Sequence, residues 1–271
     1  MEAESPVTAK EERERRLKLN SRFDMDDSAV MVPAMFSRYP ELRSGMSTRR
    51  GRRSETGFEM NLSYRVGDDP ASVERNRELF FSQCGISGAA LAVPLQIHSS
   101  VVRTAEIPGD YPDCDALVTG TSGLALTVMV ADCVPVFLFD PLHHAIGLVH
   151  AGWRGTVNLI VKRAVEKMQE EFGTQTEHVL ASIGPSAGPC CYEVGEDVAV
   201  KFGKKIVPYL LPKYFIDLKK ENALQLQQSG VVPGNIEISA HCTICEPHLF
   251  HSYRRDGKRA GRMMAALSVI S

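Results

Sequence analysis

The chain has 271 residues, of which 44% are hydrophobic, which is enough apolar material for a sizeable core. A formal net charge of −2 gives no reason to expect nucleic acid or an anionic membrane as a partner. No apolar run approaches the length of a membrane span, and the N-terminus lacks the apolar region of a secretory signal, so we expect a soluble, cytoplasmic protein.

The chain begins with a charge-dense stretch, residues 1–30, in which every residue from Lys10 to Arg16 is charged. Mixed signs at this density are typical of a solvated segment, so we expect a peripheral arm followed by one domain over 31–271. A second basic cluster, Arg49 to Arg53, could contact phosphate, but the near-neutral chain favours a solvated loop.

The first predicted helix follows Pro70 and covers 71–81, because proline is tolerated in the first turn of a helix. Arg77 lies on this helix. A guanidinium that faces a cleft can bind a phosphate through two hydrogen bonds, whereas one on a helix surface usually only covers apolar area with its stem. Arg77 is therefore a candidate phosphate-binding residue.

Four apolar runs in the middle of the chain predict strands, at 91–95, 126–130, 134–139 and 145–149. His98 follows the first of these runs, Cys133 precedes the third, and His150 follows the fourth. Side chains at strand ends often face clefts, and functional residues gather on the loops that strands hold in place. We therefore look for chemistry at these three positions.

Two kinds of site fit these residues. Cys133 with His150 or His98 could be a nucleophile and its base. Alternatively, one thiolate and two imidazoles could bind a metal ion and leave a fourth position open, which is the arrangement of catalytic zinc. Each residue taken alone is more often an ordinary buried group, because free cysteine packs as a small hydrophobe.

The clearest helical pattern covers 156–172, where apolar residues recur at every third and fourth position. Thr156 is the predicted N-cap. A helix that begins here would direct its first N–H groups toward the presumed site and favour an anion. Arg154, two residues earlier, is a second candidate for phosphate binding.

The remainder of the chain predicts strands at 179–183 and 235–240, helices at 194–202 and 217–228, and a last strand or helix at 263–270. Charged and aromatic residues over 250–262 predict a substrate-facing loop, and Arg254 on it is a third candidate for phosphate binding. These elements give an α+β fold class, a single layered α/β domain with mixed β-sheets and flanking helices.

The six other cysteines are expected to be reduced thiols, because the chain has an odd number of cysteines and is large enough to fold without crosslinks. Adjacent Cys190 and Cys191 would need strained geometry to pair with each other. The single C-x2-C pair, Cys242 and Cys245, lacks the second pair of a zinc ribbon, so a thiol without a metal or redox role is favoured.

Seven short motifs occur in one order along the chain: Gln96 to Ser99, Asp115 to Thr119, Ala131 to Val136, His150 to Thr156, Ile183 to Pro185, Tyr192 to Gly195 and Ser252 to Asp256. This ordered set resembles the signature of the laccase-domain family, long labelled multicopper polyphenol oxidoreductase, whose members act as purine nucleoside phosphorylases. The resemblance implies a zinc ion on His98, Cys133 and His150.

The resemblance also implies phosphorolysis of adenosine, inosine, guanosine or methylthioadenosine, with adenosine deamination as an additional activity. Catalytic roles fall to Cys133 and Asp132, the latter as the acid or base nearest the metal. A copper-dependent polyphenol oxidase is less favoured, because copper oxidases need many imidazoles and the eight histidines include no His-x-His pair. A Cys-His hydrolase leaves the second histidine unexplained.

Overall fold

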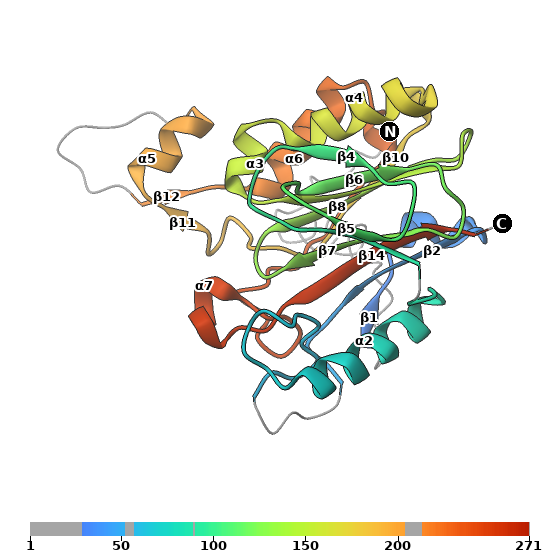
Figure 1. Cartoon of the computed structure of the whole chain (residues 1–271). Helices are drawn as coiled ribbons and strands as arrows, with labels where there is room; N and C mark the ends of the chain where they lie inside the picture. Colours follow the sequence, from blue (N-terminus) through green and yellow to red (C-terminus); the bar gives the residue numbers. More distant parts are fainter. Residues whose placement is uncertain (1–28, 52–56, 89, 204–212, 271) are drawn as a thin grey trace, which may run out of the picture.

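The computed structural model describes residues 29–51, 57–88, 90–203 and 213–270, which fold into four layers (Figure 1). Two six-stranded sheets lie in the middle, with helix α2 on the outer face of one and helices α4 and α6 on the outer face of the other. Residues 1–28 of the predicted arm, and Arg52 and Arg53 of the basic cluster, lie outside the described residues.

The first sheet has the order β1-β2-β14-β7-β3-β5. Its first four strands pair antiparallel, whereas β7, β3 and β5 run parallel. Its strands, in chain order, are β1 (Val30–Met31), β2 (Leu42–Ser47), β3 (Leu91–Pro94), β5 (Gly109–Tyr111), β7 (Ala125–Val130) and β14 (Met263–Val269).

The second sheet has the order β13-β10-β8-β9-β6-β4, with parallel pairs at both edges and antiparallel pairs between them. Its strands are β4 (Val102–Thr104), β6 (Ala116–Thr119), β8 (Val134–Asp140), β9 (Ala145–Ala151), β10 (Leu180–Ile183) and β13 (Ile236–Ile238); β11 (Glu193–Val194) and β12 (Tyr214–Phe215) form a separate pair. The predicted fold class, mixed sheets with flanking helices, is confirmed.

The central strands are apolar on both faces because both faces are buried. In β8, Phe137 and Phe139 enter the core between the sheets, while Leu138 enters the core beneath α4. In β14, Leu267 enters the first of these cores and Ala266 the core beneath α2. This double burial explains why the sequence shows continuous apolar runs rather than alternation.

The α-helices are α2 (Pro70–Cys84), α3 (Trp153–Val157), α4 (Ile160–Phe172), α5 (Glu196–Ala199), α6 (Leu218–Gln228) and α7 (Tyr253–Asp256); short 3-10 turns are η1 (Ala34–Arg38), η2 (Thr176–His178), η3 (Val200–Phe202), η4 (Pro233–Asn235) and η5 (Gly257–Arg259). Asp69 caps α2 by accepting a hydrogen bond from the Ser72 N–H, and Gly85 ends the helix in the left-handed conformation. None of the described helices is long and apolar enough to cross a membrane.

The helix predicted over 156–172 is wrong at its start, because it is two helices. Leu159 takes a left-handed φ of 62° and separates α3 from α4. Thr156 is not an N-cap: it lies buried inside α3, and its hydroxyl hydrogen-bonds the Asn222 side chain of α6. Gly152 precedes the first turn, and that helix is only five residues long. Tertiary pairing with α6 has overridden the local sequence pattern.

The helix predicted over 194–202 is also wrong over part of its length. Val194 pairs with Tyr214 in the small two-stranded sheet, and Gly195 is extended, so α5 starts only at Glu196 and continues into η3. The predicted strands at 179–183 and 235–240 and the helix at 217–228 occur with small boundary differences as β10, β13 and α6.

A buried histidine, His251, should make stability depend on pH. Its ring lies against Gly261, and Nε2 donates a hydrogen bond to the Glu59 carbonyl at 2.7 Å. Burial lowers the pKa of this imidazole from 6.5 to about 4. Between about pH 4 and pH 6.5, the His251 imidazole binds a proton in the unfolded chain but not in the folded chain. The folded state therefore loses stability as the pH falls through this range.

We therefore expect the free energy of unfolding to fall by on the order of 3 kcal/mol between pH 7 and pH 4 through this group alone. Denaturant titration of His251→Gln should show a correspondingly flatter pH dependence. His178→Gln, at an exposed histidine, is the matched control and should keep the wild-type dependence. An unchanged pH dependence in His251→Gln would contradict the prediction.

Candidate metal centre and active site

The register of the β8–β9 hairpin brings Cys133 and His150 together. Val134 pairs with Ala151 and Pro135 with His150, so the start of β8 lies against the end of β9. Cys133, immediately before β8, therefore faces the chain at Gly152, whose backbone approaches closely. A Cβ at position 152 would lie 3.1 Å from the Cys133 Sγ. A side chain at this position would therefore crowd the thiol and the His98 ring, whose Cδ2 would lie 3.3 Å away.

The third residue, His98, lies on the connection from the first sheet to the second. It lies on the loop between β3 and β4. The Gln96 side chain holds this loop against β7, because Nε2 of Gln96 donates to the Met129 carbonyl and Oε1 of Gln96 accepts from the Met129 N–H. His98 itself has a φ of 60°, a conformation that non-glycine residues rarely adopt. The site thus lies where the ends of both sheets meet.

The His98, Cys133 and His150 side chains converge as the sequence predicts. One ligand atom of each lies within 4.8 Å of the other two, and the two imidazole rings stand edge to face with centroids 5.0 Å apart. His150 is buried, Cys133 half-buried and His98 exposed, so the cluster opens on one side. This group can hold a metal ion and leave a coordination position accessible.

The Asp115 carboxylate connects the two histidines. It accepts hydrogen bonds from the backbone N–H groups of Ile97 (3.2 Å), His98 (3.0 Å) and Ser99 (2.6 Å), and it lies 2.8 Å from Nδ1 of His150. A carboxylate acceptor places the His150 proton on Nδ1 and leaves Nε2 as the free ligand atom. Asp115 therefore fixes both the backbone of one histidine and the tautomer of the other.

The electrostatics of the cluster favour an ionised Asp115 and a thiolate at Cys133, and these two anions raise the pKa of His150 to about 9. Burial alone would raise the pKa of Asp115, but hydrogen bonds from His150 and Ser99 lower it to about 2. Burial alone would likewise raise the pKa of the Cys133 thiol, but the imidazoles of His150 and His98 favour the thiolate and lower its pKa. The thiolate is the form of cysteine that binds metals.

A cavity of about 860 Å³ opens above the three residues. Besides Tyr64, its wall carries Trp153, Tyr192 and Tyr253, which come from α3, from the segment before β11 and from α7 at the same end of the sheets (Figure 1). Tyr253, Arg254 and Arg262 of the segment predicted to face substrate, 250–262, line this cavity. A cavity of this size with aromatic walls suits a small organic molecule.

The structure separates the three arginines predicted to bind phosphate. Arg254 and Arg77 line the cavity, whereas Arg154 is not among its lining residues; its guanidinium lies over the Trp153 ring at 4.3 Å. Arg65 and Arg262 also line the cavity, although no sequence pattern favoured them. Arg262 is half-buried, and burial lowers the pKa of its guanidinium.

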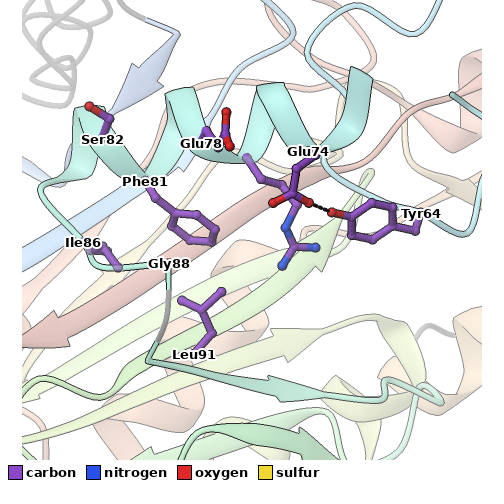
Figure 2. Close-up of a pocket in the computed structure, with 9 residues that line it drawn as sticks. Tyr64, Glu74, Glu78, Phe81, Ser82, Ile86, Gly88 and Leu91 are labelled. Carbon is purple, nitrogen blue, oxygen red and sulfur yellow. Dashed lines mark hydrogen bonds between the residues drawn. The ribbon is translucent and has the colours of Figure 1, made fainter. Parts of the chain in front are cut away.

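Arg77 is shared with a second hollow of about 480 Å³ beside α2. Tyr64, which lines both hollows, donates a hydrogen bond to Glu74, and Glu78 lies on the same helix (Figure 2). The Arg77 guanidinium lies over the Tyr64 ring at 5.2 Å, close to these acidic groups. Arg254, by contrast, lies over Tyr192 and donates to the Glu193 carbonyl.

Asp132 lines the cavity next to Cys133 with its carboxylate already hydrogen-bonded. It accepts from the Thr243 hydroxyl (2.7 Å), the Ser252 hydroxyl (3.0 Å) and the Arg254 backbone N–H (2.6 Å). Its φ of 84° is unusual for a residue with a side chain. The carboxylate holds the loop that carries Arg254 in place.

Sequence reasoning missed Asp115 and Tyr192 as site residues. Both residues begin motifs that the sequence shows. The sequence does not show, however, that the Asp115 carboxylate accepts from the loop that carries His98, because β4 separates the two in the chain. An aspartate directly before an apolar strand was the available signal, because a buried carboxylate at a strand start needs donors.

The fold and the site together define the class of protein: a two-sheet α/β protein in which two histidines and one cysteine can hold a metal at the floor of a cavity. Residues 43–270 match the family model described as multi-copper polyphenol oxidoreductase laccase, and the chain belongs to this family.

Its relatives carry enzyme names. A purine nucleoside phosphorylase of Bacteroides thetaiotaomicron is 34% identical over 90% of this chain and 97% of its own. A protein of an unknown prokaryote, named adenosine deaminase RL5, is 34% identical over 80% of this chain and 88% of its own. The crystal structure of YlmD from Geobacillus stearothermophilus superposes with a TM-score of 0.84 at 29% identity, covering 92% of this chain and 99% of that one.

Replacing Asp115 should weaken metal binding without removing a ligand. In Asp115→Asn the side-chain amide has only one acceptor oxygen, so it can no longer accept from every donor of the His98 loop and of His150. Loss of a contact that orients a metal ligand typically lowers metal affinity roughly 10- to 100-fold. Competition with a chelator for Zn²⁺ measures this. Asp113→Asn, at an exposed position nearby, is the matched control. Equal affinity in both variants would contradict the role of Asp115.

Proposed function

We propose that the protein is a zinc-dependent purine nucleoside phosphorylase that cleaves adenosine, inosine, guanosine or methylthioadenosine with phosphate. The observation that carries the proposal is the convergence of His98, Cys133 and His150 at the floor of a cavity with cationic and aromatic walls. The names of the relatives support the same reaction.

Zinc is the proposed metal because the donor set suits it. One thiolate and two imidazoles with an open position are the ligands of a catalytic zinc site, where the bound ion acts as a Lewis acid on substrate or water. Polyphenol oxidation by several copper ions would require more imidazoles. Of the groups in the described residues that could hold a metal, neither contains more than two histidines.

Phosphorolysis joins a phosphate oxygen to C1′ of the sugar while the bond from C1′ to the purine nitrogen breaks. The bonding electron pair leaves with the purine, which takes up a proton, and a sugar 1-phosphate remains. The phosphate is anionic, and Arg254 and Arg262 on the cavity wall supply positive charge for it. Trp153, Tyr192 and Tyr253 offer ring faces to the flat purine.

The role of Asp132 as acid or base stays a hypothesis. The three hydrogen-bond donors to its carboxylate support a second hypothesis, a positioning role. We propose that the carboxylate positions Arg254 through the backbone N–H at 2.6 Å. Adenosine deamination remains a proposed additional activity, supported by the name of one relative. A Cys-His hydrolase acting through Cys133 would need no phosphate, and this distinguishes it from the proposed phosphorylase.

Cys133→Ala should lose the metal ion of this site together with nucleoside cleavage, because two imidazoles alone do not hold zinc tightly. Elemental analysis and an assay of purine release from inosine measure the two effects. Cys114→Ser is the matched control, since Cys114 is buried away from the cavity and a hydroxyl preserves its hydrogen bond to the Tyr111 carbonyl. Undiminished purine release by Cys133→Ala would contradict the assignment.

Arg254→Ala should raise the phosphate concentration needed for half-maximal turnover by roughly ten- to a hundredfold, because a charge-assisted contact contributes about 1.5 to 3 kcal/mol. Arg154→Ala is the control. Arg154 carries the same charge near the site but lies outside the cavity wall, so its loss should leave the phosphate dependence nearly unchanged. A larger effect at Arg154 than at Arg254 would restore the anion site predicted from the sequence.

A further inference from the structure

Four thiols converge outside the active-site cavity. Cys190 and Cys191 precede β11, and Cys242 and Cys245 follow β13. The four sulfur atoms all lie within 4.8 Å of one another, and the Cys245 Sγ is 3.5 Å from that of Cys190 and 3.2 Å from that of Cys191. All seven cysteines of the chain are free thiols in the structure.

The sheet brings the two pairs together. Strands β10 and β13 are parallel neighbours, so the segments that follow them leave the sheet at the same end. Ser186 then forms a bridge with Cys242, which holds the two segments side by side. The sequence offered no second pair for the C-x2-C pair of Cys242 and Cys245. The fold supplies this second pair as Cys190 and Cys191, although Cys190 precedes Cys242 by 52 residues.

The spacing of the sulfur atoms fits a tetrahedral metal site. Zn–S bonds of about 2.3 Å give a tetrahedron with sulfur–sulfur edges of about 3.8 Å. The observed cluster brackets this value, with its two short pairs at 3.2 and 3.5 Å and no pair beyond 4.8 Å. Four sulfur atoms this close together could bind one ion. Cys190 and Cys245 are exposed, so an ion has a path to the site.

Backbone donors and a nearby cation surround the Cys242 end of the cluster. The Gly188 N–H donates to the Cys242 Sγ at 3.2 Å, and a Cβ at position 188 would lie within 3.4 Å of the Cys190 and Cys242 sulfur atoms. Glycine at 188 therefore lets the backbone reach the sulfur. The buried Lys219 lies close to the cluster and donates to the carbonyls of Ser239 and His241, so a positive charge offsets part of the negative charge of four thiolates.

We propose that Cys190, Cys191, Cys242 and Cys245 form a second, structural metal site that binds one Zn²⁺ ion through four thiolates. Four protein ligands leave no open position, which distinguishes this site from the His98, Cys133 and His150 cluster. The inference stands independently of the proposed nucleoside chemistry, because it rests on a separate set of residues.

The site would fix two segments that build the active-site wall. Thr243, between the two cysteines of the C-x2-C pair, donates to the Asp132 carboxylate at 2.7 Å. Tyr192, which lines the cavity, directly follows Cys191. The Arg255 guanidinium donates to the Thr243 carbonyl at 2.8 Å, which adds the loop of Arg254 to the same assembly. A metal ion here acts on the cavity only by positioning these residues.

Zinc content separates the two sites. Protein purified under reducing conditions with excess zinc removed should hold two zinc ions per chain. Cys133→Ala should keep one, and X-ray absorption of that variant should show four sulfur ligands at about 2.3 Å. Cys245→Ser, at an exposed cysteine, should also keep one, bound by sulfur and nitrogen. Cys114→Ser is the matched control and should keep two.

Wild-type protein with one zinc ion that is lost in Cys133→Ala but retained in Cys245→Ser would overturn the second site and leave the proposed function intact. A zinc ion retained in Cys133→Ala and lost in Cys245→Ser would support the second site and contradict the first. Should Cys245→Ser fail to fold, the absorption spectrum of Cys133→Ala still decides, because fewer than four sulfur ligands rejects the four-thiolate site. A disulfide within the four cysteines, found by mass measurement of alkylated protein, also rejects it.

Discussion

The hydrogen bonds to the Asp115 carboxylate are the constraint on which the candidate active site depends. Asp115 directly precedes β6 in one sheet, yet its carboxylate accepts from the loop that follows β3 in the other. The same carboxylate orients His150 at the end of β9. One buried, ionised group thereby holds two metal-ligand candidates, one at the end of β9 and one on the loop that connects the two sheets, and the donors around it offset the free energy of burying its charge.

The rest of the fold supplies a rigid frame for this contact. Strands β8, β9 and β14 are buried along their whole length, so little of the unusual backbone geometry at the site can relax. His98 and Asp132 both have positive φ, and conformations of this kind typically raise the free energy by about 1–3 kcal/mol each. Their occurrence beside the cavity is consistent with a preorganised functional site.

Much of the fold and the three metal-ligand candidates could be predicted from sequence, because continuous apolar runs define buried strands and because Cys133 precedes β8, His150 lies near the end of β9 and His98 lies on the loop after β3. What the sequence did not predict depends on tertiary contacts. Thr156 looked like a helix cap, but Asn222 of α6 binds its hydroxyl. The partners of the C-x2-C pair became visible only when parallel β10 and β13 placed Cys190 beside Cys242.

Phosphorus NMR of the reaction products tests the central claim most directly. With inosine and inorganic phosphate, the cavity chemistry around His98, Cys133 and Arg254 predicts one sugar 1-phosphate for each hypoxanthine released, and loss of that signal in Cys133→Ala. Release of hypoxanthine with free ribose, at a rate independent of phosphate, would show a hydrolase and contradict the account.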